Sequence, residues 1–103
     1  MSKGKVLIVD DSLSTVRIVE KMLKNEGFEV IASSDGVEGL KKVYIEHPDL
    51  VILDLVLPLL DGFEVCRSLK QSEKCKDILI IICTARKELI EGERDKIGAD
   101  LYS

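Results

Sequence analysis

Histidine is nearly absent from this sequence, and its cysteines are few and scattered. His47 is the only histidine, and the three cysteines at positions 66, 75 and 83 form no C-x-x-C pair. A tetrahedral zinc site therefore cannot be assembled. No secretory signal core follows Met1, and an odd number of cysteines then predicts reduced thiols in a cytoplasmic protein. We expect Cys66 and Cys83 to pack as small core residues and Cys75 to be exposed in a loop.

Long apolar runs, glycine-rich phosphate motifs and an excess of basic residues are missing as well. No apolar run approaches the roughly 20 residues that cross a bilayer, so no membrane span is expected. The absence of G-x-x-x-x-G-K-[ST] and of G-x-G-x-x-G after the first strand argues against a nucleotide or flavin binder. The 15 basic and 19 acidic residues give a net charge of −4, which disfavours direct nucleic-acid binding.

Short apolar runs alternate with segments of helical periodicity along the 103 residues, a length that predicts one domain. The expected strands are residues 5–10, 29–33, 50–54 and 78–83, with a fifth beginning at 101–102. The helical patterns run from residue 16 to Gly27, from Asp35 to His47 and from Asp61 onward, and a charged segment covers 86–96. This alternation predicts right-handed βαβ units, a parallel sheet and a doubly wound α/β fold in three αβα layers.

Acidic residues and a threonine follow three of the expected strands. Asp10 and Asp11 end the first strand, Asp54 ends the third, and Thr84 with Ala85 follows the fourth. Because ligands collect at the carboxyl ends of parallel strands, we expect these groups to converge on one rim. Crowded carboxylates bind a cation or share protons, and oxygen ligands without His or Cys favour Mg²⁺. A carboxylate beside Mg²⁺ is also a competent nucleophile toward phosphoryl donors.

Four motifs in this sequence resemble those of the receiver domains of bacterial and archaeal response regulators. They are V-D-D-S at 9–12, L-D-L-V-L-P-L-L-D-G at 53–62, T-A at 84–85 and G-A-D-L-Y at 98–102. Their order and spacing match those of the family, so the resemblance covers essentially the whole chain and identifies residues 1–103 as a receiver domain. It implies a flavodoxin-like parallel sheet of five strands in the order 2-1-3-4-5.

The resemblance also implies a phosphorelay switch centred on Asp54. This residue would accept a phosphoryl group from a sensor histidine kinase or a His-containing phosphotransfer protein. Asp10 and Asp11 would bind Mg²⁺ directly or through water, together with Asp54 and the backbone carbonyl of Val56. The domain would catalyse only its own phosphorylation and dephosphorylation, and would act on an output domain or target protein that the sequence does not identify.

Further residues would hold the phosphoryl group and carry the signal. By the resemblance, Thr84 would hydrogen-bond the phosphoryl group and swing toward it, and the backbone N–H of Ala85 would assist. Tyr102 matches an aromatic switch that turns inward when Thr84 moves. Val56 and Arg86 occupy positions that tune how long the phosphoryl group survives. Homodimerisation on phosphorylation is compatible with the family and is neither required nor excluded by the sequence.

The resemblance is incomplete at the C-terminal end. Members of the family carry a lysine at the end of strand five, which here would fall two residues beyond Ser103, and a final helix follows it. We therefore expect a domain truncated at its C-terminus, with an incomplete fifth strand. One face of the fourth strand would then lack its covering helix and leave an apolar patch exposed.

Other interpretations of the same residues remain open at this point. Asp10, Asp11 or Ser12 would also serve merely as a helix cap, and Tyr102 as a half-buried strand aromatic. A haloacid-dehalogenase-type phosphatase is disfavoured because Val56 stands where that family needs an acid/base aspartate. The main alternative is a receiver-like interaction module that is not phosphorylated, against which the intact acidic residues argue.

Overall fold

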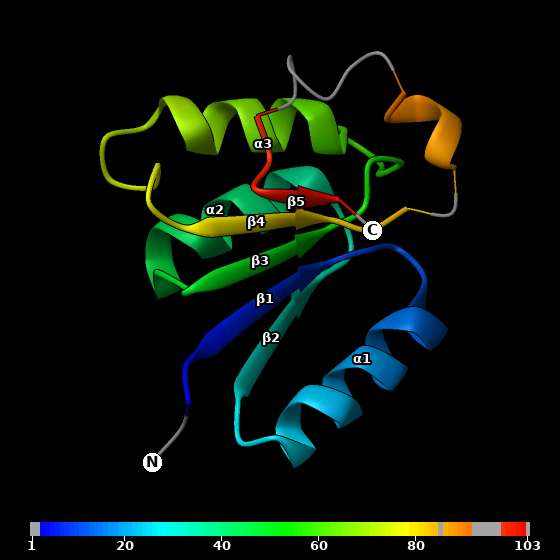
Figure 1. Ribbon diagram of the computed structural model, residues 1–103, viewed down its shortest axis with the longest axis vertical. Coiled ribbons are helices and arrows are strands. Elements are labelled where there is room, and N and C mark those ends of the chain that lie inside the picture. The colour runs from blue at the N-terminus through cyan, green and yellow to red at the C-terminus, as the bar shows by residue number, and fades with distance from the viewer. Residues whose placement is uncertain (1–2, 85, 92–97, 103) are drawn as a thin grey trace.

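A five-stranded parallel sheet forms the centre of the chain in this computed structural model, which describes residues 3–84, 86–91 and 98–102, without the side chains of 87, 101 and 102. The elements in chain order are β1 (Lys5–Val9), α1 (Leu13–Asn25), β2 (Glu29–Ser33), α2 (Gly36–Glu46), β3 (Leu50–Leu53), α3 (Gly62–Gln71), β4 (Leu79–Ile82), the 3₁₀ turn η1 (Lys87–Leu89) and β5 (Leu101–Tyr102). The strands lie in the order β2-β1-β3-β4-β5 (Figure 1). The predicted doubly wound fold and strand order are confirmed, and β5 is a short strand of two residues.

Alternate residues of the strands face two separate clusters of apolar side chains. On one face, Leu7, Leu53 and Ile82 pack with residues of α2 and α3. On the other face, Val6 and Ile8 pack with α1, so the helices form the two outer layers (Figure 1). Strands covered on both faces read as continuous apolar runs, which is why these segments lack the alternation of a half-exposed strand.

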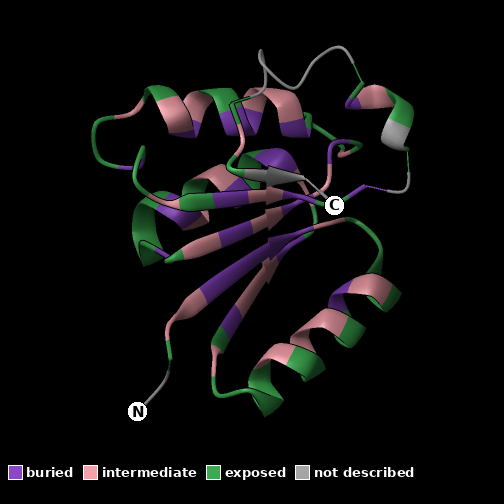
Figure 2. Ribbon diagram, in the orientation of Figure 1, coloured by how far each residue is buried: buried purple, intermediate pink, exposed green. Residues whose placement is uncertain are grey.

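The two faces are buried to different extents. Leu53 and Ile82, on the face of α2 and α3, are completely buried. On the opposite face of the same strands, Ile52 and Ile81 are only partly buried and Leu79 is 56% exposed. Figure 2 shows that buried residues lie largely in the strands, whereas α1 is mostly intermediate or exposed and its buried residue is Val16. Among the described residues, the buried strand residues that pack with α1 are Val6, Ile8 and Val30, so α1 covers mainly the β1 and β2 side of its face.

The helix ends follow the sequence signals. Ser12, Asp35 and Asp61 are the N-caps of α1, α2 and α3, and each side chain accepts a backbone N–H in the first turn of its helix. Gly27 ends α1 in the left-handed region at φ 96°, with its N–H and that of Phe28 bonded back to the last turn. The first helix begins earlier than its apolar periodicity predicted, because the Ser12 cap starts it at Leu13, whose side chain is 62% exposed and does not join the apolar face.

Two of the three cysteine predictions were wrong. Cys66 is buried as expected, and burial raises the pKa of its thiol to about 11. Cys75 is also completely buried, because the turn after α3, in which its N–H bonds to the carbonyl of Ser72, carries it into the main core. Cys83 is exposed, because β4 ends at Ile82 and the chain leaves the core there.

An ion pair joins the end of α3 to the start of β5. Lys70 Nζ donates to Asp100 Oδ2 at 2.7 Å and to the carbonyl oxygens of Lys76 and Ile78 at 3.2 and 3.1 Å. The same Asp100 oxygen accepts the backbone N–H of Ile80 at 2.8 Å. Burial acts to raise the pKa of Asp100, but the hydrogen bonds from Lys70 and Ile80 outweigh it and the pKa is lowered. These contacts fix the residue that precedes β5.

We expect Asp100→Asn to lower the free energy of unfolding by about 1 kcal/mol at neutral pH, a modest value because the carboxylate is partly exposed. A carboxyl group with a lowered folded pKa stabilises the native state above its unfolded value of 3.8 and loses this effect as the pH falls through the folded pKa. Urea unfolding of both proteins between pH 6 and pH 3 should therefore show the difference shrinking with acidification. Asp77→Asn, at an exposed carboxylate, is the control, and a difference independent of pH would contradict the assignment.

Candidate functional site

The carboxyl ends of β1, β3 and β4 lie at one edge of the sheet. Backbone hydrogen bonds continue the pairing one step past the strands, from Asp54 N to the carbonyl of Val9 at 3.0 Å and from Cys83 N to the carbonyl of Leu53 at 2.9 Å. Asp10 N likewise donates to the carbonyl of Ser33 at 3.0 Å. The residues that follow the strands are thus held by the sheet itself and do not rest on free loops.

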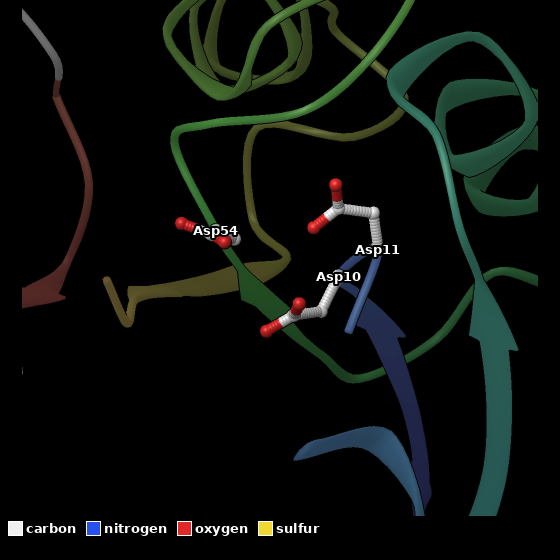
Figure 3. Close-up of side chains that lie close together, drawn as sticks. All are labelled: Asp10, Asp11 and Asp54. Atoms are coloured by element: carbon white, nitrogen blue, oxygen red, sulfur yellow. The ribbon is translucent and has the colours of Figure 1, made fainter. Parts of the chain in front are cut away.

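Three carboxylates converge at this edge. One oxygen from each of Asp10, Asp11 and Asp54 lies within 4.8 Å of the other two. Figure 3 shows Asp10 and Asp11 at the end of β1 and Asp54 beside them at the end of β3. Asp11 is exposed, whereas Asp10 and Asp54 are partly buried. The sequence predicted this convergence, and the structure brings the three side chains together.

The pKa of Asp10 reflects the burial and crowding of the carboxylates. Its pKa is raised, chiefly because partial burial disfavours the charged form, and the neighbouring charges of Asp54 and Asp11 add to the effect. The N–H of Ser12 donates to Asp10 Oδ1 at 2.8 Å and opposes this shift. Ser12 is the N-cap of α1, and the carboxylates of Asp10 and Asp11 both belong to the cluster.

The donor set of the cluster fits a hard divalent cation. Three carboxylate groups on one rim supply the oxygen ligands that Mg²⁺ prefers, and among the described residues no histidine or cysteine belongs to this group. A cation would also offset the repulsion by Asp54 and Asp11, which adds to the effect of burial in raising the pKa of Asp10. Asp10, Asp11 and Asp54 are the residues that would hold it.

The loop after Asp54 begins with a backbone contact to the Asp54 side chain. Val56 N donates to Asp54 Oδ1 at 3.3 Å, and the Val56 side chain is 44% exposed. Further along, Leu60 N donates to the carbonyl of Pro58 at 2.8 Å, and the intervening Leu59 has a φ of 70°. This is a tight three-residue turn with a strained central residue, which the sequence had not indicated.

The other residues predicted to act at the site follow β4 or lie in β5. Thr84 is 7% exposed and follows β4, and its Oγ1 accepts the N–H of Arg86 at 3.2 Å. Arg86 is exposed, and its Nε donates to Glu88 at 3.0 Å. Ala85 and the side chain of Tyr102 lie outside the described residues, although the backbone of Tyr102 pairs with Ile82 in β5. The roles predicted for Thr84, Ala85, Arg86 and Tyr102 at the phosphorylation site thus stay predictions.

Comparison with known proteins decides the family. The sequence profile of the response regulator receiver domain matches residues 6–100. This chain belongs to the response regulator receiver domain family. The receiver domain is 45% identical to the alkaline phosphatase synthesis transcriptional regulatory protein PhoP of Bacillus subtilis, an alignment that covers 95% of this chain and 40% of PhoP. The receiver domain thus spans about two fifths of that curated relative.

Solved structures with the same fold agree with this assignment. The receiver domain superposes on the chemotaxis response regulator CheY4 of Vibrio cholerae with a TM-score of 0.86 and 32% identity, covering 96% of this chain and 83% of CheY4. It also matches the receiver domain of the sensor histidine kinase PA1611 of Pseudomonas aeruginosa, described with a magnesium ion in its active-site cleft, at a TM-score of 0.86 and 26% identity, covering 97% of this chain and 83% of that one. Within the described residues, no helix has the length and hydrophobicity of a membrane span.

Proposed function

We propose that this receiver domain, comprising residues 1–103, accepts a phosphoryl group on Asp54 in a Mg²⁺-dependent reaction. The convergence of the Asp10, Asp11 and Asp54 carboxylates within 4.8 Å at the carboxyl edge of the sheet is the observation that supports this most directly. The donor would be a phosphohistidine of a sensor kinase or phosphotransfer protein, and a small acyl phosphate would replace it in the test tube. Family membership and the magnesium ion in the PA1611 receiver support the same chemistry.

The transfer is a substitution at phosphorus. An oxygen of the Asp54 carboxylate attacks, the bond between phosphorus and the histidine nitrogen breaks, and the imidazole keeps the electron pair and takes up a proton from solvent. Magnesium, when bound, offsets negative charge on the phosphoryl oxygens. Asp10, Asp11 and Asp54 would hold the cation together with the Val56 carbonyl. The Thr84 hydroxyl and the Ala85 N–H would bind the phosphoryl oxygens. Attack of water on phosphorus would then release phosphate and regenerate the Asp54 carboxylate.

The signal would pass through the residues next to the phosphoryl group. Thr84 is nearly buried beside the end of β3, and a movement toward Asp54 would break its bond to the Arg86 N–H. In the proposal this movement is coupled to Tyr102 in β5, while Val56 and Arg86 set the lifetime of the acyl phosphate. The switched surface then acts on an output domain or target protein in the cytoplasm.

Intact mass measurement after incubation with acetyl phosphate and Mg²⁺ tests the proposal. We expect the protein to gain the mass of one phosphoryl group with Mg²⁺ present and to remain unmodified with EDTA. Treatment with hydroxylamine should remove the added mass, because an acyl phosphate is cleaved by this nucleophile. Failure to form the adduct at saturating acetyl phosphate, both in this chain and in one extended through the lysine and final helix of the family, would contradict the phospho-acceptor function and favour an interaction module.

A further inference from the structure

The start of α2 makes backbone contact with the loop that follows the proposed phosphorylation site. Gly36, the first residue of α2, donates its N–H to the carbonyl of Pro58 at 3.3 Å. A Cβ atom on Gly36 would lie 1.7 Å from the carbonyl oxygen of Leu60 and 2.6 Å from its carbonyl carbon. Because the opposing atoms belong to the backbone, a side chain here could be accommodated only if the loop moved.

The other end of the same loop is held in a similar way. Gly62 N donates to the carbonyl of Leu55 at 3.0 Å, and a Cβ on Gly62 would lie 2.2 Å from the carbonyl oxygen of Asp54. The loop from Leu55 to Asp61 is thus fixed at its base by Gly62 and at its tip by Gly36. Val56 lies between these two points of attachment.

The tip itself is strained and protrudes into solvent. Leu59 has a φ of 70° and its side chain is 80% exposed, so little packing by its own side chain holds this conformation. The contacts to Gly36 hold the carbonyl of Pro58 and crowd that of Leu60 on either side of Leu59. A strained turn persists only where its surroundings determine it, and here α2 supplies that support.

We infer that Gly36 is a positioning residue for the metal and phosphorylation site, acting through the 55–61 loop. The inference rests on the proposed function, in which the Val56 carbonyl binds Mg²⁺. A displaced tip would shift Val56 relative to Asp54, whose side chain its N–H also contacts. Groups that orient metal ligands from outside the ligand set typically change metal affinity about 10-fold to 100-fold when altered.

The test compares Gly36→Ala with Gly27→Ala by titrating each ¹⁵N-labelled protein with MgCl₂ and following the backbone amide signals. Gly27 is at the end of α1, and the atoms nearest to an added methyl there are those of the flexible Lys3 side chain at 3.6 Å, while its φ of 96° still makes alanine destabilising. We expect Gly36→Ala to weaken Mg²⁺ affinity about tenfold. Gly27→Ala should lose stability and keep its affinity. Equal affinities in the two variants would overturn the inference.

Leu59→Ile keeps the inference testable if Gly36→Ala does not fold. A β-branched residue is strongly disfavoured at a φ of 70°, so this change disfavours the turn without adding an atom, and because the side chain is 80% exposed the fold should survive. We expect weaker Mg²⁺ binding and shifted amide signals at Val56 without metal, and unchanged affinity would count against a role for the tip. If wild type itself binds no Mg²⁺, the proposed function fails, and the loop contact is then judged by whether Gly36→Ala or Leu59→Ile shifts the metal-free Val56 amide.

Discussion

Asp54→Asn should abolish the phosphoryl adduct, with a rate at least about 100-fold below that of wild type. The amide of asparagine is a poor nucleophile, whereas its oxygen can still accept the N–H of Val56, which bonds Asp54 Oδ1 at 3.3 Å in the wild type. The change therefore removes the attacking group while keeping the local backbone. Intact mass after incubation with acetyl phosphate and Mg²⁺ measures the result directly.

A second aspartate serves as the matched control for this experiment. Asp77→Asn removes the same charge at an exposed position in the turn before β4, away from the sheet edge where Asp54 lies. This variant should form the adduct at the wild-type rate. An adduct that persists in Asp54→Asn would place phosphorylation on another residue, for which Asp11, the exposed carboxylate of the cluster, is the first candidate.

Asp11→Asn should weaken Mg²⁺ binding by about tenfold or more, because it takes one of three negative oxygen ligands from the cluster. Asp11 suits this test better than Asp10, whose carboxylate also accepts the N–H of Ser12 and supports the start of α1. Isothermal titration with MgCl₂ measures the change in affinity, and urea unfolding shows that stability in the absence of metal is retained.

The control for this variant is a charge change outside the cluster. Glu26→Gln neutralises an exposed carboxylate at the C-terminal end of α1 and should leave the affinity for Mg²⁺ unchanged. If Asp11→Asn and Glu26→Gln had the same small effect, the binding would reflect net charge and not a defined ligand set. If Asp11→Asn bound as tightly as wild type, Asp11 would not be a ligand.

The fold and the acidic cluster could be predicted because both depend on local pattern and on one topological rule. Apolar runs such as 50–53 are long enough only for strands, and a parallel sheet brings the residues after its strands to a common edge. Asp10 and Asp54 are separated by 44 positions (54 − 10), yet their meeting follows once β1 and β3 are neighbours. The boundaries were less accurate, since residues 10, 54 and 83 lie just beyond the strands.

The cysteines show where sequence patterns fail. Cys75 lies in the charged segment S-E-K-C-K-D and Cys83 ends the apolar run I-L-I-I-I-C, yet Cys75 is buried and Cys83 is exposed, opposite to the prediction. Which side of the chain meets the core after a turn depends on the path of that turn, and the pattern of neighbouring residues does not encode it. The Lys70 to Asp100 ion pair joins residues 30 apart for the same reason.

The sequence by itself determined the strands and the rim that carries Asp10, Asp11 and Asp54, and its motifs pointed to the family, whose resemblance supplied the sheet order. Apolar runs and the alternation of strands with helices are local patterns, so they can be read without coordinates. Only the tertiary structure decided how the loop after Asp54 is held, through backbone contacts of Gly36 with Pro58 and Leu60. Close approach of two backbones depends on how helices and loops pack in three dimensions, and a glycine in the sequence does not reveal which carbonyl it faces.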